Sequence, residues 1–239
     1  MKKIAFALLA IIALYSCSKE HNDTNLHITG NIKGLKQGKL YINRIADTVV
    51  ITMDSITIKG DSRFESYLKL ESPEMLFLVL DRGETNSIDD QIPFFAEPGE
   101  MKIESNIDGF YANAKITGSE NQKIYEQFKQ IKSRYSTQNA ELHAETYKAK
   151  GNVKIIDSLN DKAEQLLKKR YLVTANFAKN NANHEVGPYL ALSEIYDANI
   201  IYLDTIRKSM SPEVANSRYG KLLTKFVEDR KKEEAAKTE

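Results

Sequence analysis

Residues 114–124, Ala-Lys-Ile-Thr-Gly-Ser-Glu-Asn-Gln-Lys-Ile, separate two parts of the chain that have different hydrophobic patterns. Before Gly118 the apolar residues alternate with polar residues or form short runs, which is typical of strands. After Ser119 they recur every three or four residues, which is typical of an amphipathic helix. Ser119 and Gln122 have the spacing of a capping box, so a helix is predicted to begin there. The sequence therefore predicts an α+β fold, with the strands first and the helices second.

The first part, residues 26–118, is predicted to be an antiparallel β-sandwich of about eight short strands. Leu26, Ile28 and Ile32 alternate with polar residues, as in a half-buried strand. Residues 75–80 form a continuous apolar run, which indicates a strand buried on both faces. Turn residues separate such segments about every 8–12 residues. The sequence shows no βαβ alternation, which argues against a Rossmann fold or a TIM barrel.

The second part, residues 119–227, is predicted to be a helical region. Apolar residues recur at helical intervals from Ile124 onward, and Ser211 followed by Pro212 is a strong start signal for a later helix. Residues 228–239 carry five acidic and four basic side chains and almost no apolar ones. We therefore predict that this charged tail is disordered.

Residues 1–16 have the features of a secretory signal peptide. Two lysines precede an apolar run, residues 4–14, which as a helix would be about 16 Å long. A hydrocarbon core of about 30 Å is too thick for it to cross. The run ends at Leu-Tyr-Ser-Cys, residues 14–17, which resembles a bacterial lipobox and contains the only cysteine of the chain. We therefore predict cleavage after residue 16 and lipid attachment at Cys17.

Residues 17–25 are predicted to be the lipidated cysteine followed by a polar tether. Three acyl chains would anchor the protein firmly, since each buried CH₂ contributes about 0.8 kcal/mol. We therefore expect a lipid-anchored protein of the cell envelope, in the outer membrane. Lys19-Glu20 resembles the charged signals that send some Bacteroidetes-type lipoproteins to the cell surface. The sequence does not decide whether the protein is exposed at the cell surface or lies on the periplasmic face.

The composition excludes several classes of function. Thirty-four basic residues balance thirty-three acidic residues, for a formal net charge of +1. This balance argues against a nucleic-acid binder that works by neutralising phosphates. A single cysteine cannot form an intramolecular disulfide, a CxxC redox pair or a multi-cysteine zinc site.

No residue pattern in the sequence indicates catalysis or a cofactor. The P-loop, GxGxxG and G-x-S-x-G motifs are absent. No two of the four histidines have the spacing of a metal site. We interpret them as unrelated surface residues: His21, His27, His143 and His184. Of these, His27 is expected to face solvent or to lie at a sheet rim. We predict no metal, no cofactor and no catalytic residue.

Acidic and aromatic groups provide three weaker candidate sites. A group of carboxylates could suggest calcium, but it lacks EF-hand spacing and favours a solvated loop: Asp81, Glu84, Asp89, Asp90 and Asp108. Glu97 and Glu100 could imitate a catalytic carboxylate pair, but they flank Pro98-Gly99 and are expected to be hairpin turn residues. The pair Phe110-Tyr111 is expected near a rim of the sandwich, with most other aromatic residues in the core.

Several short segments together resemble a known family. Three lie in the sandwich and its end, residues 28–41, residues 54–73, and residues 98–103 followed by 116–121, and two lie in the helical region, residues 186–190 and 218–222. They resemble the N-terminal β-domain of unknown function, and its helical linker, in Bacteroidetes envelope lipoproteins. In many members a thioredoxin-like domain with a CxxC follows the helices. This chain has no counterpart of those catalytic residues, so the resemblance implies no redox activity here.

These patterns favour a lipid-anchored, non-enzymatic binding or scaffolding module. One alternative is an accessory protein that acts on a thioredoxin-like enzyme in trans. Another is a surface glycan- or peptide-binding lipoprotein of a nutrient-uptake system, although the chain has no tryptophan for stacking on sugars. Apart from the membrane, the expected partner is therefore another envelope protein, and no nucleic acid is expected.

Overall fold

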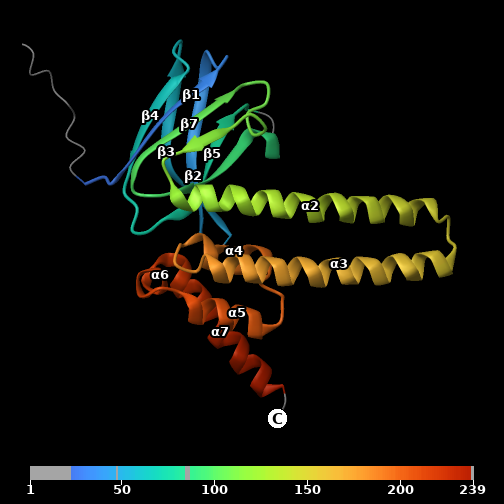
Figure 1. Cartoon of the computed structure of the whole chain (residues 1–239). Helices are drawn as coiled ribbons and strands as arrows, with labels where there is room; N and C mark the ends of the chain where they lie inside the picture. Colours follow the sequence, from blue (N-terminus) through green and yellow to red (C-terminus); the bar gives the residue numbers. More distant parts are fainter. Residues whose placement is uncertain (1–22, 47, 84–86, 238–239) are drawn as a thin grey trace, which may run out of the picture.

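The computed structural model of the chain describes residues 23–46, 48–83 and 87–237. Within these residues the α+β prediction is confirmed, since eight strands come first and six α-helices follow (Figure 1). The strands are β1 (Leu26–Lys33), β2 (Gln37–Ala46), β3 (Val49–Lys59), β4 (Arg63–Leu68), β5 (Glu74–Asp81), β6 (Gln91–Ala96), β7 (Gly99–Asn106) and β8 (Lys115–Thr117). The helices are α2 (Glu120–Lys148), α3 (Val153–Asn180), α4 (Val186–Glu194), α5 (Ile200–Ser209), α6 (Pro212–Asn216) and α7 (Arg218–Ala236), and a short 3₁₀ turn, Ile88–Asp90, precedes β6. The predicted signal peptide and Cys17 lie outside the described residues.

The strands form two four-stranded sheets, in the orders β4-β1-β7-β8 and β3-β2-β5-β6. All neighbouring strands are antiparallel except β1 and β7, which pair in parallel from Leu26 opposite Gly99 to Lys33 opposite Asn106. Because β6 and β7 belong to different sheets, the Pro98-Gly99 segment joins the two sheets. The expectation that Glu97 and Glu100 flank a hairpin turn is therefore wrong.

The interior of the sandwich confirms the alternating pattern seen in the sequence. Leu26, Ile28 and Ile32 are buried on one face of β1, and Met101 and Ile103 on β7 join them. Residues 49–59 form the single long strand β3. A β-bulge in its pairing with β2, between Ile42 and Asn43, lets β3 bend without ending.

A second hydrophobic core lies between the sandwich and the helices. Met75 of β5 and Phe95 of β6 point away from the sandwich interior and are buried among helical residues. Their helical neighbours in this core include Phe128, Leu190 and Leu223. This explains the apolar run at residues 75–80, because one face of β5 supports the first core and the other face supports the second. The strands and the helices are therefore packed into one body.

Two polar residues at the start of α2, Gln122 and Asn121, join the helices to the strands by hydrogen bonds. Ser119 caps the helix by accepting a hydrogen bond from the Gln122 N–H, at 2.9 Å, as the capping-box spacing predicts. The Gln122 side chain does not close the box. Its Oε1 atom instead accepts a hydrogen bond from the backbone N–H of Phe95, at 2.7 Å. Since β6 is an edge strand, this bond satisfies a buried donor that has no partner strand.

The neighbouring Asn121 joins three segments. Its backbone N–H donates to Glu97 Oε2 at 3.1 Å, its side-chain amide donates to Glu185 Oε2 at 3.1 Å, and its Oδ1 accepts from the Val186 N–H at 2.9 Å. Asn121 and Gln122 are each about 1% exposed. The link between the sheets, the start of α2 and the start of α4 are therefore held at one buried point.

The prediction of a disordered tail differs from the structure, because α7 continues through Ala236. Arg230 donates to the backbone oxygens of Tyr196 and Ala198, at 2.8 and 2.9 Å, and Lys231 pairs with Asp204 of α5 at 2.9 Å. Partners far away in the sequence thus hold a segment that is too polar to fold by burial alone. Among the described residues, none of the helices is long and apolar enough to cross a membrane.

Replacing Gln122 with alanine tests the fastening role of this side chain. The Phe95 N–H would stay buried without an acceptor, so we expect Gln122→Ala to lower the free energy of unfolding by about 1–3 kcal/mol. Urea denaturation followed by circular dichroism measures this change. The exposed neighbour Lys123 is the matched control, and Lys123→Ala should have a much smaller effect. Equal losses in both variants would contradict the role given to Gln122.

Candidate functional site

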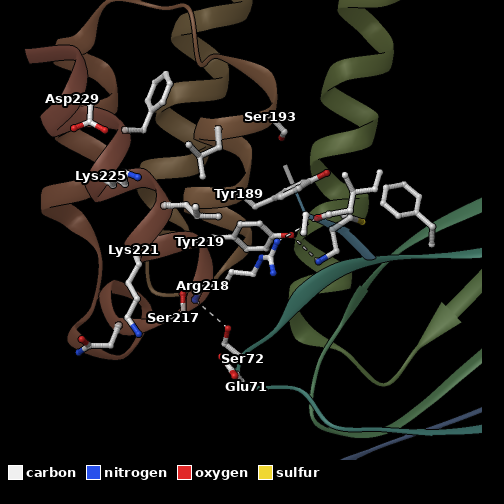
Figure 2. Close-up of a pocket in the computed structure, with 18 residues that line it drawn as sticks. Glu71, Ser72, Tyr189, Ser193, Ser217, Arg218, Tyr219, Lys221, Lys225 and Asp229 are labelled. Atoms are coloured by element: carbon white, nitrogen blue, oxygen red, sulfur yellow. Dashed lines mark hydrogen bonds between the residues drawn. The ribbon is translucent and has the colours of Figure 1, made fainter. Parts of the chain in front are cut away.

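A hollow lies where the sandwich meets the helices (Figure 2). This junction groove has a volume of about 1060 Å³, which is large enough for a small ligand or a peptide segment. Strand-side residues line one wall and helix-side residues line the other. They are Ile45, Ala46, Glu71, Ser72, Met75 and Phe77, and then Tyr189, Leu192, Ser193, Asn216, Ser217, Arg218, Tyr219, Lys221, Leu222, Lys225, Phe226 and Asp229.

The inner part of the junction groove is aromatic. Tyr189 of α4 and Tyr219 of α7 extend toward the strands and meet edge to face, with their ring centroids 5.1 Å apart. Phe95 of β6 lies behind both rings, at 5.6 Å from Tyr189 and 6.0 Å from Tyr219. The Tyr219 hydroxyl accepts a hydrogen bond from the Met75 N–H at 3.0 Å, so α7 also contacts the strand wall directly.

Both tyrosine hydroxyls stay protonated at neutral pH. Burial raises the pKa of Tyr189 to about 12, and it also raises the pKa of Tyr219, despite the opposing hydrogen bond from Met75. A phenol that keeps its proton is a hydrogen-bond donor and not a base. These two residues can therefore bind and orient a ligand, and they are unsuited to removing a proton from it.

A buried ion cluster supports the strand wall. Glu74, which is only 4% exposed, lies between two arginines, with Arg44 Nη1 at 3.5 Å and Arg218 Nη1 at 3.6 Å from its carboxylate oxygens. Arg218 also donates from its backbone N–H to Ser72 Oγ at 3.2 Å and from its side chain to the Ile45 oxygen at 3.3 Å. The two arginines outnumber Glu74 within the cluster, and the charge of Glu71, on the same wall of the groove, also acts on it.

The outer part of the junction groove carries exposed charges on α7. Lys221, Lys225 and Asp229 follow one another at intervals of four residues, so they share one face of the helix. Across the groove, Glu71 is the acidic residue of the strand wall. Neither lysine forms an ion pair within the described residues. The arrangement favours a ligand whose apolar part packs near the tyrosines while an anionic group meets Arg218 and the two lysines.

The histidines, which the sequence predicted to be unrelated surface residues, do not gather into a site. His27 on β1, His143 on α2 and His184 between α3 and α4 lie on separate elements, and Cys17 and His21 are outside the described residues. His27 is partly buried at the sheet surface, where it stacks on Tyr67 and its Nδ1 lies 2.7 Å from Glu100. Within the described residues, no cluster of three or more acidic, histidine or cysteine side chains could hold a metal.

The acidic loop is less solvated than expected. Asp90 is buried and accepts a hydrogen bond from Arg82, which also donates to the Ile107 oxygen at 2.8 Å. Asp90 therefore fixes the loop to the sandwich, whereas Asp81, Asp89 and Asp108 are exposed and Glu84 is outside the described residues.

Two further expectations require correction. Glu97 is a cap for α2, since its Oε2 accepts from the Ser119 hydroxyl at 2.8 Å as well as from Asn121. Phe110 is a core residue, 1% exposed, and only Tyr111 is near the surface.

Sequence reasoning did not single out Tyr189, Tyr219 or Arg218 as site residues. Each lies in one of the two helical segments that carried the family resemblance, residues 186–190 and 218–222. These segments come together at the groove only because α4 and α7 pack side by side. A signal was therefore present in the sequence, but nothing local indicated that the two segments meet.

Glu74 gives the site a pH dependence with a defined sign. Burial raises the pKa of Glu74 above its usual value of 4.5, although both arginines oppose this. The stabilisation from such a group is present below the unfolded-state pKa and is lost as the pH rises through the folded-state pKa.

We therefore expect the free energy of unfolding of the wild type, minus that of Glu74→Gln, to fall as the pH rises above the usual pKa of 4.5. Urea titrations at pH values on both sides of this pKa measure the difference, with the exposed residue variant Glu233→Gln as a baseline. A difference that grows with pH would show that attraction to the arginines outweighs burial.

Comparison with known proteins supports part of the resemblance seen in the sequence. Residues 26–125 match a family model described as a domain of unknown function (DUF4369). A search of curated proteins gave no match. The matched region contains every strand and continues into the first turns of α2, so it includes Asn121 and Gln122. The strand-rich part of this chain is thus similar to the DUF4369 domain of unknown function.

Proposed function

We propose that this chain is a lipid-anchored protein of the cell envelope that works as a non-enzymatic binding module, with the junction groove as its binding site. The observation that carries the proposal is the groove itself. It is an open hollow between strands and helices, with an aromatic inner part and an outer part in which Arg218, Lys221 and Lys225 outnumber Glu71 and Asp229. The lipid anchor rests on the lipobox at Cys17.

The lining favours a segment of a partner protein as the ligand. Ile45 and Leu222, at 47% and 40% exposure, extend the apolar surface from the groove to its edge. A macromolecular partner would cover such an edge, whereas a small ligand held deep in the groove would leave it exposed. The segment we expect carries an apolar side chain for the aromatic part and a nearby carboxylate for Arg218 and the lysines.

Site-specific photo-crosslinking in cells tests this proposal. A photoreactive amino acid at Leu222 should capture a partner, which mass spectrometry then identifies together with the crosslinked peptide. The same amino acid at exposed Lys115, on β8 and outside the groove lining, should not capture it. Equal capture at both positions would contradict a specific groove.

Charge reversal in the same experiment tests the ligand chemistry. Lys221→Glu with Lys225→Glu should reduce capture at Leu222 at least about tenfold, because an anionic group then meets two acids. Lys232→Glu with Lys237→Glu is the matched control, since it reverses two exposed lysines of the same helix region outside the groove. A captured CxxC protein would favour the accessory role, and a transporter would favour the uptake role. A captured peptide without an acidic residue would count against the ligand chemistry proposed here.

The anchor has its own test. Cys17→Ser removes the thiol that would carry the lipid, so we expect the protein to move from the membrane fraction to the soluble fraction. Cell fractionation with metabolic fatty-acid labelling measures both effects. Unchanged membrane association of an unlabelled variant would contradict anchoring at this residue and leave the groove unaffected.

A further inference from the structure

The outer parts of α2 and α3, residues 132–170, form an arm that extends well beyond the sandwich and the other helices (Figure 1). Among these residues, all of which the structure describes, Leu159 alone is buried. The other buried residues of α2 lie between Asn121 and Phe128, and those of α3 lie between Thr174 and Ala178. The arm therefore rests almost entirely on the contact between its own two helices.

That contact has the spacing of a helical bundle. The half-buried residues recur at intervals of three, four or seven along both helices: Tyr135, Leu142 and Thr146 on α2, and Ile156, Ala163, Leu166 and Arg170 on α3, with Leu159 among them. Such spacing places apolar side chains along one seam. Two helices alone leave both sides of the seam open to water, whereas four helices enclose it.

One side of the seam is a groove of about 310 Å³, which we call the arm groove. From α2 it is lined by Gln138, Glu141, Leu142 and Glu145, and from α3 by Lys162, Gln165, Leu166 and Lys169. The acidic residues are all on α2 and the basic residues are all on α3. None of these four charges forms an ion pair within the described residues, although the neighbouring Glu164 and Lys168 do, at 2.6 Å.

Two exposed apolar residues extend the same surface. Ile155 is seven residues before Lys162, and Leu172 is seven residues after Gln165, so both continue the α3 side of the arm groove. They are 48% and 44% exposed. The surface therefore offers an apolar strip and four unpaired charges over much of the length of the arm.

We propose that the arm groove is a homodimer interface, in which the arms of two copies of this chain form an antiparallel four-helix bundle. A two-fold axis parallel to the arm places α2 of one copy against α3 of its partner, so acids face bases on both sides. A two-fold axis across the arm would place α2 against α2 and repel like charges. The charge pattern thus selects both the occupant and the geometry, because a surface that complements itself under a two-fold axis fits a second copy.

Charge reversal tests this interface on the chain from Ser18 onward, which contains every described residue and lacks Cys17. Sedimentation equilibrium should show a dimer. Glu141→Lys with Glu145→Lys should raise the dimer dissociation constant by at least about tenfold, because bases then face bases. Asp157→Lys with Asp161→Lys is the matched control, since it reverses two exposed acids of the arm that do not line the groove.

Restoration distinguishes the interface from damage to the helices. Lys162→Glu with Lys169→Glu should weaken the homodimer to a similar extent, and mixing these chains with the Glu141→Lys, Glu145→Lys chains should give a heterodimer of restored affinity. All four changes in one chain should restore the homodimer. A wild type that is monomeric at every concentration, or a four-fold variant that stays monomeric with wild-type helicity, would overturn the proposal.

Disulfide trapping tests the pairing of helices independently. The chain from Ser18 onward has no cysteine, so single cysteines can be placed at Gln138 and Gln165. Under mild oxidation, a mixture of Gln138→Cys and Gln165→Cys chains should crosslink faster than either alone, because α2 faces the partner's α3. Faster crosslinking of Gln138→Cys with itself would overturn the proposed axis. None of these outcomes depends on the ligand of the junction groove.

Discussion

The backbone of an edge strand requires partners, and in this protein a helix provides one of them. β6 ends its sheet, and the Phe95 N–H on it is buried under the helices, where water cannot serve as acceptor. Gln122 accepts that hydrogen bond, and Asn121 beside it ties α2 to the start of α4 and to Glu97. Because α4 is fixed there, Tyr189 meets Tyr219, and the wall of the junction groove has a defined position.

The ion cluster around Glu74 is better explained by its positioning of Arg218 than by a contribution to the stability of the fold. Burial raises the pKa of this carboxyl even with two arginines beside it, so the loss of hydration outweighs the attraction. The Nε atoms of Arg44 and Arg218 also lack acceptors among the described residues. Replacing all three charged residues with apolar groups of similar volume would therefore cost the fold little. What the cluster does achieve is to hold Arg218 at the edge of the groove.

Local signals in the sequence predicted the elements, and long-range contacts decided the rest. The alternation in β1 and the cap at Ser119 depend on neighbouring residues, so both were predictable. The parallel pairing of β1 with β7 joins residues more than seventy positions apart, and Glu97 caps a helix that begins beyond two further strands. The tail shows the same limit, since α7 is held by Asp204 and by backbone oxygens that composition cannot indicate. The junction groove was missed because its aromatic walls come from segments that meet only in the fold.

The junction groove and the arm groove have no lining residue in common and lie on different parts of the helical region. A dimer formed through the arms would leave both junction grooves open and would fix their relative orientation. Two sites in one rigid assembly bind a partner with repeated segments more tightly than one site, because the second contact is intramolecular. A groove of modest affinity would then bind such a partner more tightly in the dimer than in a single chain. Dimer formation would give the long, sparsely packed arm a physical purpose that the stability of a single chain does not provide.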